Sequence, residues 1–297
     1  MRKNELAWLQ KQGFDLNGKT AAITGATGGL GKEACRNILA LGGRLVLVNR
    51  SKEKTAALTK ELLAEFPGSE ISFIQADLTD MASVKKAAEA LLKEPLDVLV
   101  LNAGAYSIPR KTCTTGFDNV FQTNFVSHYY LVRQLLPLLL GRGAVVTAVG
   151  SIAHRYSKTD PADVDFAGRN GCALVYGNSK RYLMYALWGL QKQYPQLKLA
   201  IAHPGIAFTN ITAHYPKLLF ALIKHPMKII FMHPRRAVRS LVAGMGKPQP
   251  PLFWIGPRWF DIWGNPCVKR LHSCSPVEER HIFATAETIY QGLCGQA

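Results

Sequence analysis

Long apolar runs are missing from this chain of 297 residues. No stretch of the sequence reaches the roughly 18 uninterrupted apolar residues of a membrane-spanning helix. Residues 1–5 include charged side chains where a secretory signal peptide would be apolar. We therefore expect a cytoplasmic protein, and we leave open that it associates with a membrane surface.

Cysteine is sparse and acidic residues are in deficit. The six cysteines show no C-x-x-C spacing, which argues against a disulfide framework and a zinc site. We expect no metal site.

The 36 lysines and arginines outnumber the 20 acids, which gives a formal net charge of +16. Such an excess favours an anionic partner, namely nucleic acid, acidic lipid or a phosphorylated cofactor. No recognised nucleic-acid-binding motif is present, so nucleic acid is not expected.

Apolar segments alternate with helical ones along most of the chain. Strands are expected at 19–24, 44–49, 71–75, 96–101, 143–149 and 197–202. Helices are expected at 31–41, 51–66, 118–140 and around Tyr176. Near-continuous apolar strands separated by helices predict an α/β fold, with one doubly wound parallel sheet of the Rossmann type and helices on both faces. We expect a single domain over residues 1–297, in which ligands bind at the carboxyl ends of the strands.

Two motifs carry the chemistry. The segment 24–31 follows a strand and opens a helix, so its backbone N–H groups can hold a pyrophosphate. About 150 residues later, Tyr176 and Lys180 place a phenol and an ammonium on one face of a helix, because residues four apart are neighbours there. The two motifs in this order predict a redox enzyme.

This combination, with Asn102-Ala103-Gly104 after the fourth strand, resembles the short-chain dehydrogenase/reductase family over about residues 17–245. The resemblance implies a catalytic tetrad of Asn124, Ser151, Tyr176 and Lys180. The cofactor-binding residues that it implies are Gly25, Thr27, Gly29, Leu30, Gly31, Asp77, Leu78, Asn102, Ala103, Gly104, Tyr176, Lys180, Pro204, Gly205 and Thr209.

The residue types of the tetrad suit acid–base catalysis. A free phenol has a pKa near 10, and we expect the ammonium of Lys180 to lower the pKa of Tyr176 by favouring the phenolate. Tyr176 would then exchange a proton with the reacting alcohol or alkoxide. Ser151 would orient the carbonyl. Lys180 would also hold the nicotinamide ribose, and Asn124 would support a water chain.

The residue after the second strand bears on the choice of dinucleotide. An acid at this place binds the ribose 2′-hydroxyl in NAD-specific enzymes. Here Asn49 stands there, followed by Arg50. A guanidinium can bind a 2′-phosphate that a carboxylate would repel. We predict NADP(H) as the cofactor, with NAD(H) as the less favoured alternative.

The later segments bear on the substrate. The segment 151–166 and the long interval before Tyr176 resemble retinol dehydrogenases and WW-domain oxidoreductase-like members, which implies a hydrophobic substrate of retinoid, steroid or long-chain type. Residues 206–234 are expected to form a substrate lid, with an ordinary core helix or contact with a bilayer as alternatives. The extension 248–297 is expected to hold a strand at 252–255, an aromatic patch at 258–263 and a terminal helix. We expect the patch to pack against the core, with closing the pocket, docking a second subunit in a homo-oligomer or touching a membrane as alternatives.

Other functions on this fold remain open. One is a non-catalytic NADP(H)-binding regulatory protein, which the intact tetrad disfavours. Another is a membrane-surface protein, which the charge and the lid suggest. A nucleotide-sugar epimerase is disfavoured because its loop is normally G-x-x-G-x-x-G, and Gly25, Gly29 and Gly31 do not fit that spacing.

Overall fold

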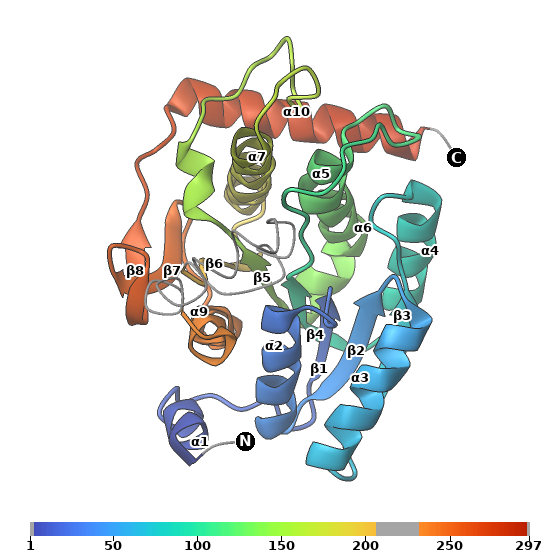
Figure 1. Ribbon diagram of the computed structural model, residues 1–297, viewed down its shortest axis with the longest axis vertical. Coiled ribbons are helices and arrows are strands. Elements are labelled where there is room, and N and C mark those ends of the chain that lie inside the picture. Colours follow the sequence, from blue (N-terminus) through green and yellow to red (C-terminus); the bar gives the residue numbers. More distant parts are fainter. Residues whose placement is uncertain (1–2, 206–231, 296–297) are drawn as a thin grey trace, which may run out of the picture.

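The computed structural model describes residues 3–205 and 232–295. At its centre lies one sheet with the strand order β3-β2-β1-β4-β5-β6-β7-β8 (Figure 1). The strands are β1 (Thr20–Thr24), β2 (Arg44–Asn49), β3 (Ile71–Gln75), β4 (Leu96–Leu101), β5 (Val145–Val149), β6 (Lys198–Ala202), β7 (Phe253–Trp259) and β8 (Trp263–Arg270). The extension after residue 248 thus adds two strands to the same sheet.

The predicted doubly wound parallel sheet is confirmed, with one antiparallel strand added at its edge. The strands from β3 to β7 pair in parallel, whereas β8 pairs antiparallel with β7. The segment 258–263, interpreted from the sequence as an aromatic patch, contains the tight turn of this hairpin. A turn this short can join only antiparallel strands. The second strand escaped prediction because Asn265, Pro266 and Lys269 interrupt its apolar pattern.

Helices cover both faces of the sheet, as predicted (Figure 1). They are α1 (Lys3–Gln10), α2 (Gly29–Ala40), α3 (Lys52–Glu65), α4 (Met81–Leu91), α5 (Asn119–Phe121), α6 (Ser127–Arg142), α7 (Cys172–Gln193), α9 (Pro234–Gly246) and α10 (Pro276–Cys294). Alternate residues of a strand point to opposite faces. Accordingly, one core cluster joins Val46 and Leu99 to α4, α6, α7 and α10, and the other joins Leu47 and Val100 to α2, α3 and α9.

The helix predicted at 118–140 is interrupted. Between α5 and α6 the chain forms a π-helical turn, η1 (Gln122–Val126), which contains Asn124. A turn of this kind breaks the regular register of a helix and is frequent at functional sites. The structure also contains α1, α4 and α9, for which the sequence analysis placed no helices.

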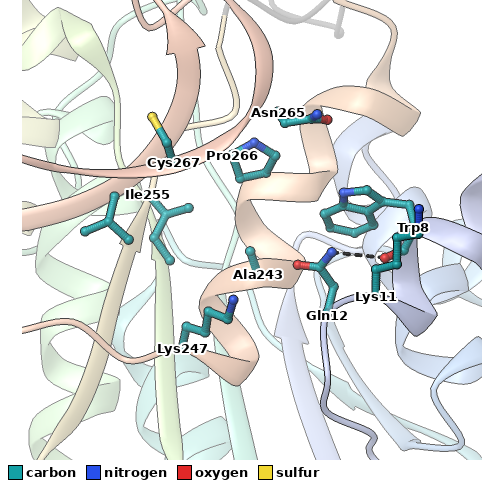
Figure 2. A pocket seen from close by; sticks show the side chains of 10 residues that line it. Trp8, Lys11, Gln12, Ala243, Lys247, Ile255, Asn265, Pro266 and Cys267 are labelled. Atoms are coloured by element: carbon teal, nitrogen blue, oxygen red, sulfur yellow. Dashed lines mark hydrogen bonds between the residues drawn. The ribbon is translucent and has the colours of Figure 1, made fainter.

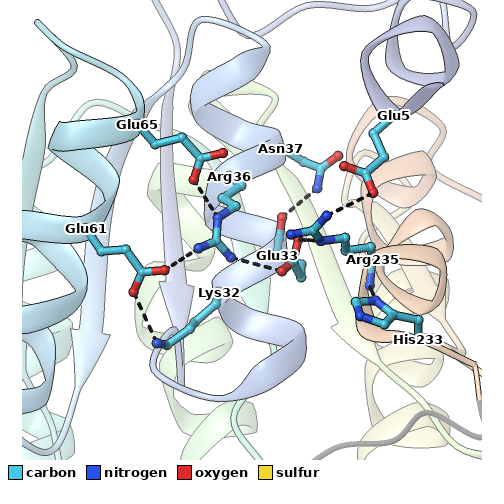
Figure 3. A network of polar contacts seen from close by, with 9 residues as sticks. All are labelled: Glu5, Lys32, Glu33, Arg36, Asn37, Glu61, Glu65, His233 and Arg235. Atoms are coloured by element: carbon cyan, nitrogen blue, oxygen red, sulfur yellow. Dashed lines mark hydrogen bonds and ion pairs between the residues drawn. The ribbon is translucent and has the colours of Figure 1, made fainter. Parts of the chain in front are cut away.

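Ion pairs fix α2 between its neighbours (Figure 3). Arg36 of α2 contacts Glu65 of α3 through Nε at 2.7 Å and also pairs with Glu61. On the other side of α2, Glu33 lies 3.7 Å from Nε of Arg235, the second residue of α9. These contacts hold the helix that follows the glycine loop in place. Within residues 3–205 and 232–295, no helix is both long enough and apolar enough to cross a bilayer.

Candidate active site

The loop after β1 has the backbone that a bound pyrophosphate requires. Gly25 has a φ of +67°, and a Cβ there would lie 2.7 Å from the Cα of Ala103. A Cβ at Gly31 would collide with the carbonyl oxygen of Gly25. Helix α2 then begins at Gly29, and its N-cap Gly28 makes no side-chain cap. The first N–H groups of α2 have no side-chain partner there, and they lie where the helix dipole favours an anion.

Thr24 and Asn102 clamp the loops after β1 and β4 together. The amide of Asn102 donates to the carbonyl oxygens of Thr24 and Gly25, at 2.9 and 3.0 Å. In return, the hydroxyl oxygen of Thr24 accepts from the backbone N–H groups of Asn102 and Ala103, each at 3.0 Å. The predicted residues Asn102 and Ala103 therefore shape the floor of the site.

His128, which the sequence analysis did not identify, contacts Thr24 of this clamp. His128 is fully buried, and its Nε2 lies 3.0 Å from the hydroxyl oxygen of Thr24. Because a carbonyl can only accept, Nδ1 of His128 donates to the carbonyl of Asn124 at 3.3 Å. Nε2 of the neutral ring is left as an acceptor facing the Thr24 hydroxyl, which also donates to the carbonyl of Val100 at 3.4 Å. Burial, together with the charge of Lys180, lowers the pKa of His128 to about 3. It is a neutral structural link, four residues after Asn124.

Asn124 joins the loop after β4 to α7. Its Oδ1 accepts from the backbone N–H of Ala105 at 2.7 Å, and its Nδ2 donates to the carbonyl of Ala105 and to the hydroxyl of Ser179, both at 2.9 Å. Both amide donors thus have protein acceptors. The side chain serves as a brace between these two segments, and its Oδ1 keeps a second lone pair. Gly104 keeps this corner open, since a Cβ there would lie 3.4 Å from Oδ1 of Asn124.

Ser151 and Tyr176 come together although their positions are far apart in sequence. Ser151 ends the turn after β5 and caps the short 3-10 helix η2 (Ile152–Arg155), where its hydroxyl oxygen accepts from the N–H of Ala153 at 3.2 Å. The same hydroxyl lies close enough to the phenol of Tyr176 to influence its pKa. The 3-10 helix fits closely against α7 because a Cβ at Gly177 would collide with the carbonyl of Ala153.

Lys180 lies one turn after Tyr176 on α7 but points to another partner. Its Nζ donates to the carbonyl of Val149 at 2.8 Å and lies 5.9 Å from the centre of the Tyr176 ring. The side chain is 1 % exposed. Burial lowers the pKa of Lys180 to about 8.

The expected lowering of the pKa of Tyr176 by Lys180 is not found. Desolvation raises the pKa of Tyr176 to about 12, and the nearby hydroxyl of Ser151 only partly opposes this. The physical reason is geometric, because the ammonium of Lys180 is directed to the Val149 carbonyl and not to the phenol oxygen. The phenol of this structure is therefore protonated at neutral pH.

The residues predicted to bind the adenosine end of the cofactor differ in their surroundings. Asn49 is 4 % exposed, and its amide accepts from the N–H of Ala26 at 2.8 Å and donates to Thr55 at 3.1 Å, so it supports the glycine loop. Arg50 is exposed, with Nη1 3.9 Å from Oδ2 of Asp77. The other oxygen of Asp77 accepts two hydrogen bonds from Thr79. The next residue, Leu78, is buried.

The segment after β6 packs on the hairpin turn. Gly205 has a φ of +79°, and a Cβ there would lie 2.8 Å from the carbonyl of Ile262. The His203 ring stacks on Trp254 at 4.8 Å, and its Nε2 lies 2.9 Å from the carbonyl of Asp261. Pro204 and Gly205 are thus placed at the carboxyl end of β6. Thr209 and nearly all of the expected lid lie outside the described residues.

A second buried network, also absent from the sequence analysis, ties the extension to the catalytic loop. His154 contacts the carbonyl of Ser151 through Nδ1 at 2.6 Å and the hydroxyl of Ser273 through Nε2 at 2.8 Å. Arg181 is 2 % exposed. It donates to the carbonyls of His154 and Ser273, at 2.8 and 2.7 Å, and pairs with Glu278 at 2.6 Å.

The charge of Glu278 is stabilised by these contacts. Burial alone would raise its pKa, but hydrogen bonds from Arg181 and from the N–H of Thr159 outweigh burial and lower the pKa of Glu278 to about 2. No motif spacing relates Arg181 to Glu278. The only sequence signals are that Arg181 follows Lys180 and that Glu278 belongs to the predicted terminal helix.

A cavity of about 320 Å³ lies elsewhere, between α1, α9 and β8 (Figure 2). Its lining includes Trp8, Lys11, Ala243, Lys247 and Cys267, and none of the predicted site residues. Among the residues that the structure describes, no group of three or more His, Cys, Asp or Glu side chains could hold a metal ion.

Comparison with known proteins adds independent evidence. Residues 19–161 match a family model described as short chain dehydrogenase. The chain is 40 % identical over 219 residues to a short-chain dehydrogenase/reductase of Armillaria gallica, covering 67 % of this chain and 69 % of the relative. It is 31 % identical to an uncharacterized oxidoreductase of Schizosaccharomyces pombe, covering 98 % of this chain and 90 % of the relative.

Two further similarities concern named proteins. Mouse retinol dehydrogenase 12 is 32 % identical over 200 residues, which cover 66 % of this chain and 63 % of that protein. The structure of the active-site complex of Pseudomonas aeruginosa RhlG with NADP is similar with a TM-score of 0.59 and 26 % identity, covering 77 % of this chain and 90 % of that chain.

Proposed function

Because this chain belongs to the short-chain dehydrogenase/reductase family of oxidoreductases, we propose that it transfers hydride between NADP(H) and a hydrophobic alcohol or carbonyl compound. The observation that carries the proposal is the proximity of the Ser151 hydroxyl to the phenol of Tyr176, with buried Lys180 one turn further along α7. These groups stand at the carboxyl ends of β5 and its neighbours, where ligands bind in such sheets.

The residues present fit a dinucleotide. The close approach of Gly25 to Ala103 leaves no room for a side chain, and the start of α2 offers N–H groups without a side-chain cap. Gly25, Gly29 and Gly31 would hold the pyrophosphate, while Gly104 would leave space on the nicotinamide side. NADP(H) would supply or accept the hydride.

The side chains of this protein would carry out the proton transfer of the reaction. With the pKa of Tyr176 raised to about 12, its phenol is protonated at neutral pH and can donate to a forming alkoxide. Ser151 would hold the carbonyl oxygen beside that phenol. For oxidation the phenol must first lose its proton, and positive charge near its oxygen would favour that loss. Lys180 would provide such a charge if its Nζ turned from the Val149 carbonyl toward the phenol oxygen.

Arg50 supports the choice of NADP(H). Its side chain is 74 % exposed, and its Nη1 lies 3.9 Å from Oδ2 of Asp77. A 2′-phosphate would offer it a charge-assisted bidentate contact. The similarity to the RhlG–NADP structure is in keeping with this assignment.

The similarity to retinol dehydrogenase 12 supports a lipophilic substrate of retinoid-like, steroid-like or long-chain type. The test is turnover of retinoid, steroid and aliphatic carbonyl panels by the purified protein, with NADPH and NADH in parallel. We expect oxidation of NADPH with at least one hydrophobic carbonyl. Binding of NADPH without turnover of any panel member would instead identify a non-catalytic NADP(H)-binding protein.

A further inference from the structure

The turn between β7 and β8 exposes a cluster of large aromatic side chains. Trp259, Phe260 and Trp263, which we call the aromatic turn, are 61 %, 81 % and 40 % exposed. They lie at one end of the hairpin that forms the edge of the sheet (Figure 1). Isolated exposed apolar residues are ordinary, but a contiguous group of this size marks an interaction site.

The backbone of the aromatic turn makes Phe260 unexpected. Phe260 and Asp261 have φ angles of +53° and +59°. A bulky residue rarely adopts a positive φ, and glycine, asparagine or aspartate is the usual choice in such a turn. With 81 % of its surface exposed, the Phe260 ring contributes little to the core. Both the positive φ and the exposure to water are unfavourable for a phenylalanine at position 260. We take this as an indication that Phe260 has a role in binding.

The charges around the aromatic turn are positive. Residues 253–272 contain a single acid, Asp261. Its carboxylate pairs with Lys269 at 2.7 Å and lies 3.6 Å from Nη2 of Arg155. Arg258, next to Trp259, is exposed. The apolar rings are therefore bordered by cations whose one acidic neighbour is already paired.

We infer that the aromatic turn docks the protein on the surface of an anionic lipid bilayer. Tryptophan rings favour the membrane–water interface, and exposed arginines beside them would meet lipid phosphates. A second copy of this chain fits less well, because a symmetric contact would bring the same cations against one another. The formal net charge of +16 favours the same anionic partner.

Docking through the aromatic turn would also orient the active-site edge of the sheet. Because β7 runs parallel to β6, it ends at the same edge of the sheet as the strands that carry the tetrad. The turn also packs on the segment after β6, where Ile262 approaches Gly205. A docked protein would hold its active-site edge toward the bilayer, where a lipophilic substrate resides. This consequence rests on the proposed function, whereas the docking does not.

The experiment is sedimentation of the full chain with vesicles of phosphatidylcholine, with and without phosphatidylserine. We expect binding that requires phosphatidylserine. Phe260→Asn suits the positive φ and should fold, and it should weaken vesicle binding about tenfold or more. Arg258→Ala should weaken binding about fivefold, and Arg258→Lys should restore it. Leu92→Asn, at a 44 % exposed position after α4, is the matched control and should bind as wild type.

Two outcomes would overturn the inference. One is a wild-type protein that does not sediment with phosphatidylserine vesicles, and the other is unchanged binding by Phe260→Asn. Light scattering without lipid tests the second copy: if Phe260→Asn converts an oligomer to a monomer while vesicles capture neither protein, the aromatic turn is a subunit interface. None of these measurements depends on turnover, so their failure is distinct from failure of the proposed function.

Discussion

The two sides of the site are built from different kinds of interaction. On the β1–β4 side, neutral amides and hydroxyls such as those of Thr24, Asn49 and Asn102 bind backbone groups. On the β5–β8 side, buried charges dominate, with Lys180 on a carbonyl and Arg181 paired with Glu278. Neutral clamps do not titrate, whereas the carboxylate of a buried ion pair takes up a proton in acid. The two sides should therefore respond differently to substitution and to acid.

The largest expected effect is at the junction of the two sides. Tyr176→Phe removes the acid–base oxygen and should reduce turnover by roughly 10²–10⁴-fold, while NADPH affinity, measured by fluorescence titration, stays near that of wild type. Tyr130→Phe on α6 is the matched control and should retain activity. Normal turnover by Tyr176→Phe would contradict the catalytic assignment.

On the charged side, Glu278→Gln should be strongly destabilising. It leaves Arg181, which is 2 % exposed, without its anionic partner. Breaking a buried pair in this way costs about 3–5 kcal/mol, to be measured as the free energy of unfolding in urea.

The control for Glu278→Gln is an ion pair between the same two helices. Lys192 of α7 and Glu279 of α10 form a pair in which Lys192 is 49 % exposed. Glu279→Gln should cost no more than about 1 kcal/mol. Equal losses in the two variants would show that the burial of Arg181 has no energetic consequence.

Acid should weaken the charged side first. The folded-state pKa of Glu278 is lowered to about 2, below its unfolded value near 4.3. Its stabilisation is therefore complete above the unfolded pKa and is lost as the pH falls toward 2, by up to about 3 kcal/mol. Urea unfolding between pH 5 and pH 3 should show a steeper loss for wild type than for Glu278→Gln. Parallel pH profiles would exclude Glu278 as the cause.

On the neutral side, the smallest effect is expected at Arg50. Arg50→Ala should raise the KM for NADPH by about 10- to 100-fold, because one charge-assisted contact to the 2′-phosphate is lost. The KM for NADH should change little. Lys60→Ala, a nearby cation on α3, provides the comparison. Equal changes for both dinucleotides would remove Arg50 as the selectivity residue.

The neutral side could be predicted from short segments, and the charged side could not. Glycines at fixed spacing and Asn102 after a strand are local signals, because their task is to shape backbone turns. Ser273 and Glu278 carry no such signal, since they act on Arg181 and His154 across the fold. The direction of the pKa of Tyr176 was wrong for a similar reason: residue spacing predicts that Lys180 is near, but not that its Nζ binds Val149.

The sequence by itself determined a parallel sheet and the glycine loop, because apolar periodicity and turn chemistry are properties of neighbouring residues, whereas the tetrad residues came from the resemblance to a family. Only the tertiary structure decided the antiparallel edge strand, the π-helical turn at Asn124 and the raised pKa of Tyr176. Those features depend on which distant groups meet and on how much water they exclude, and neither is encoded in local spacing.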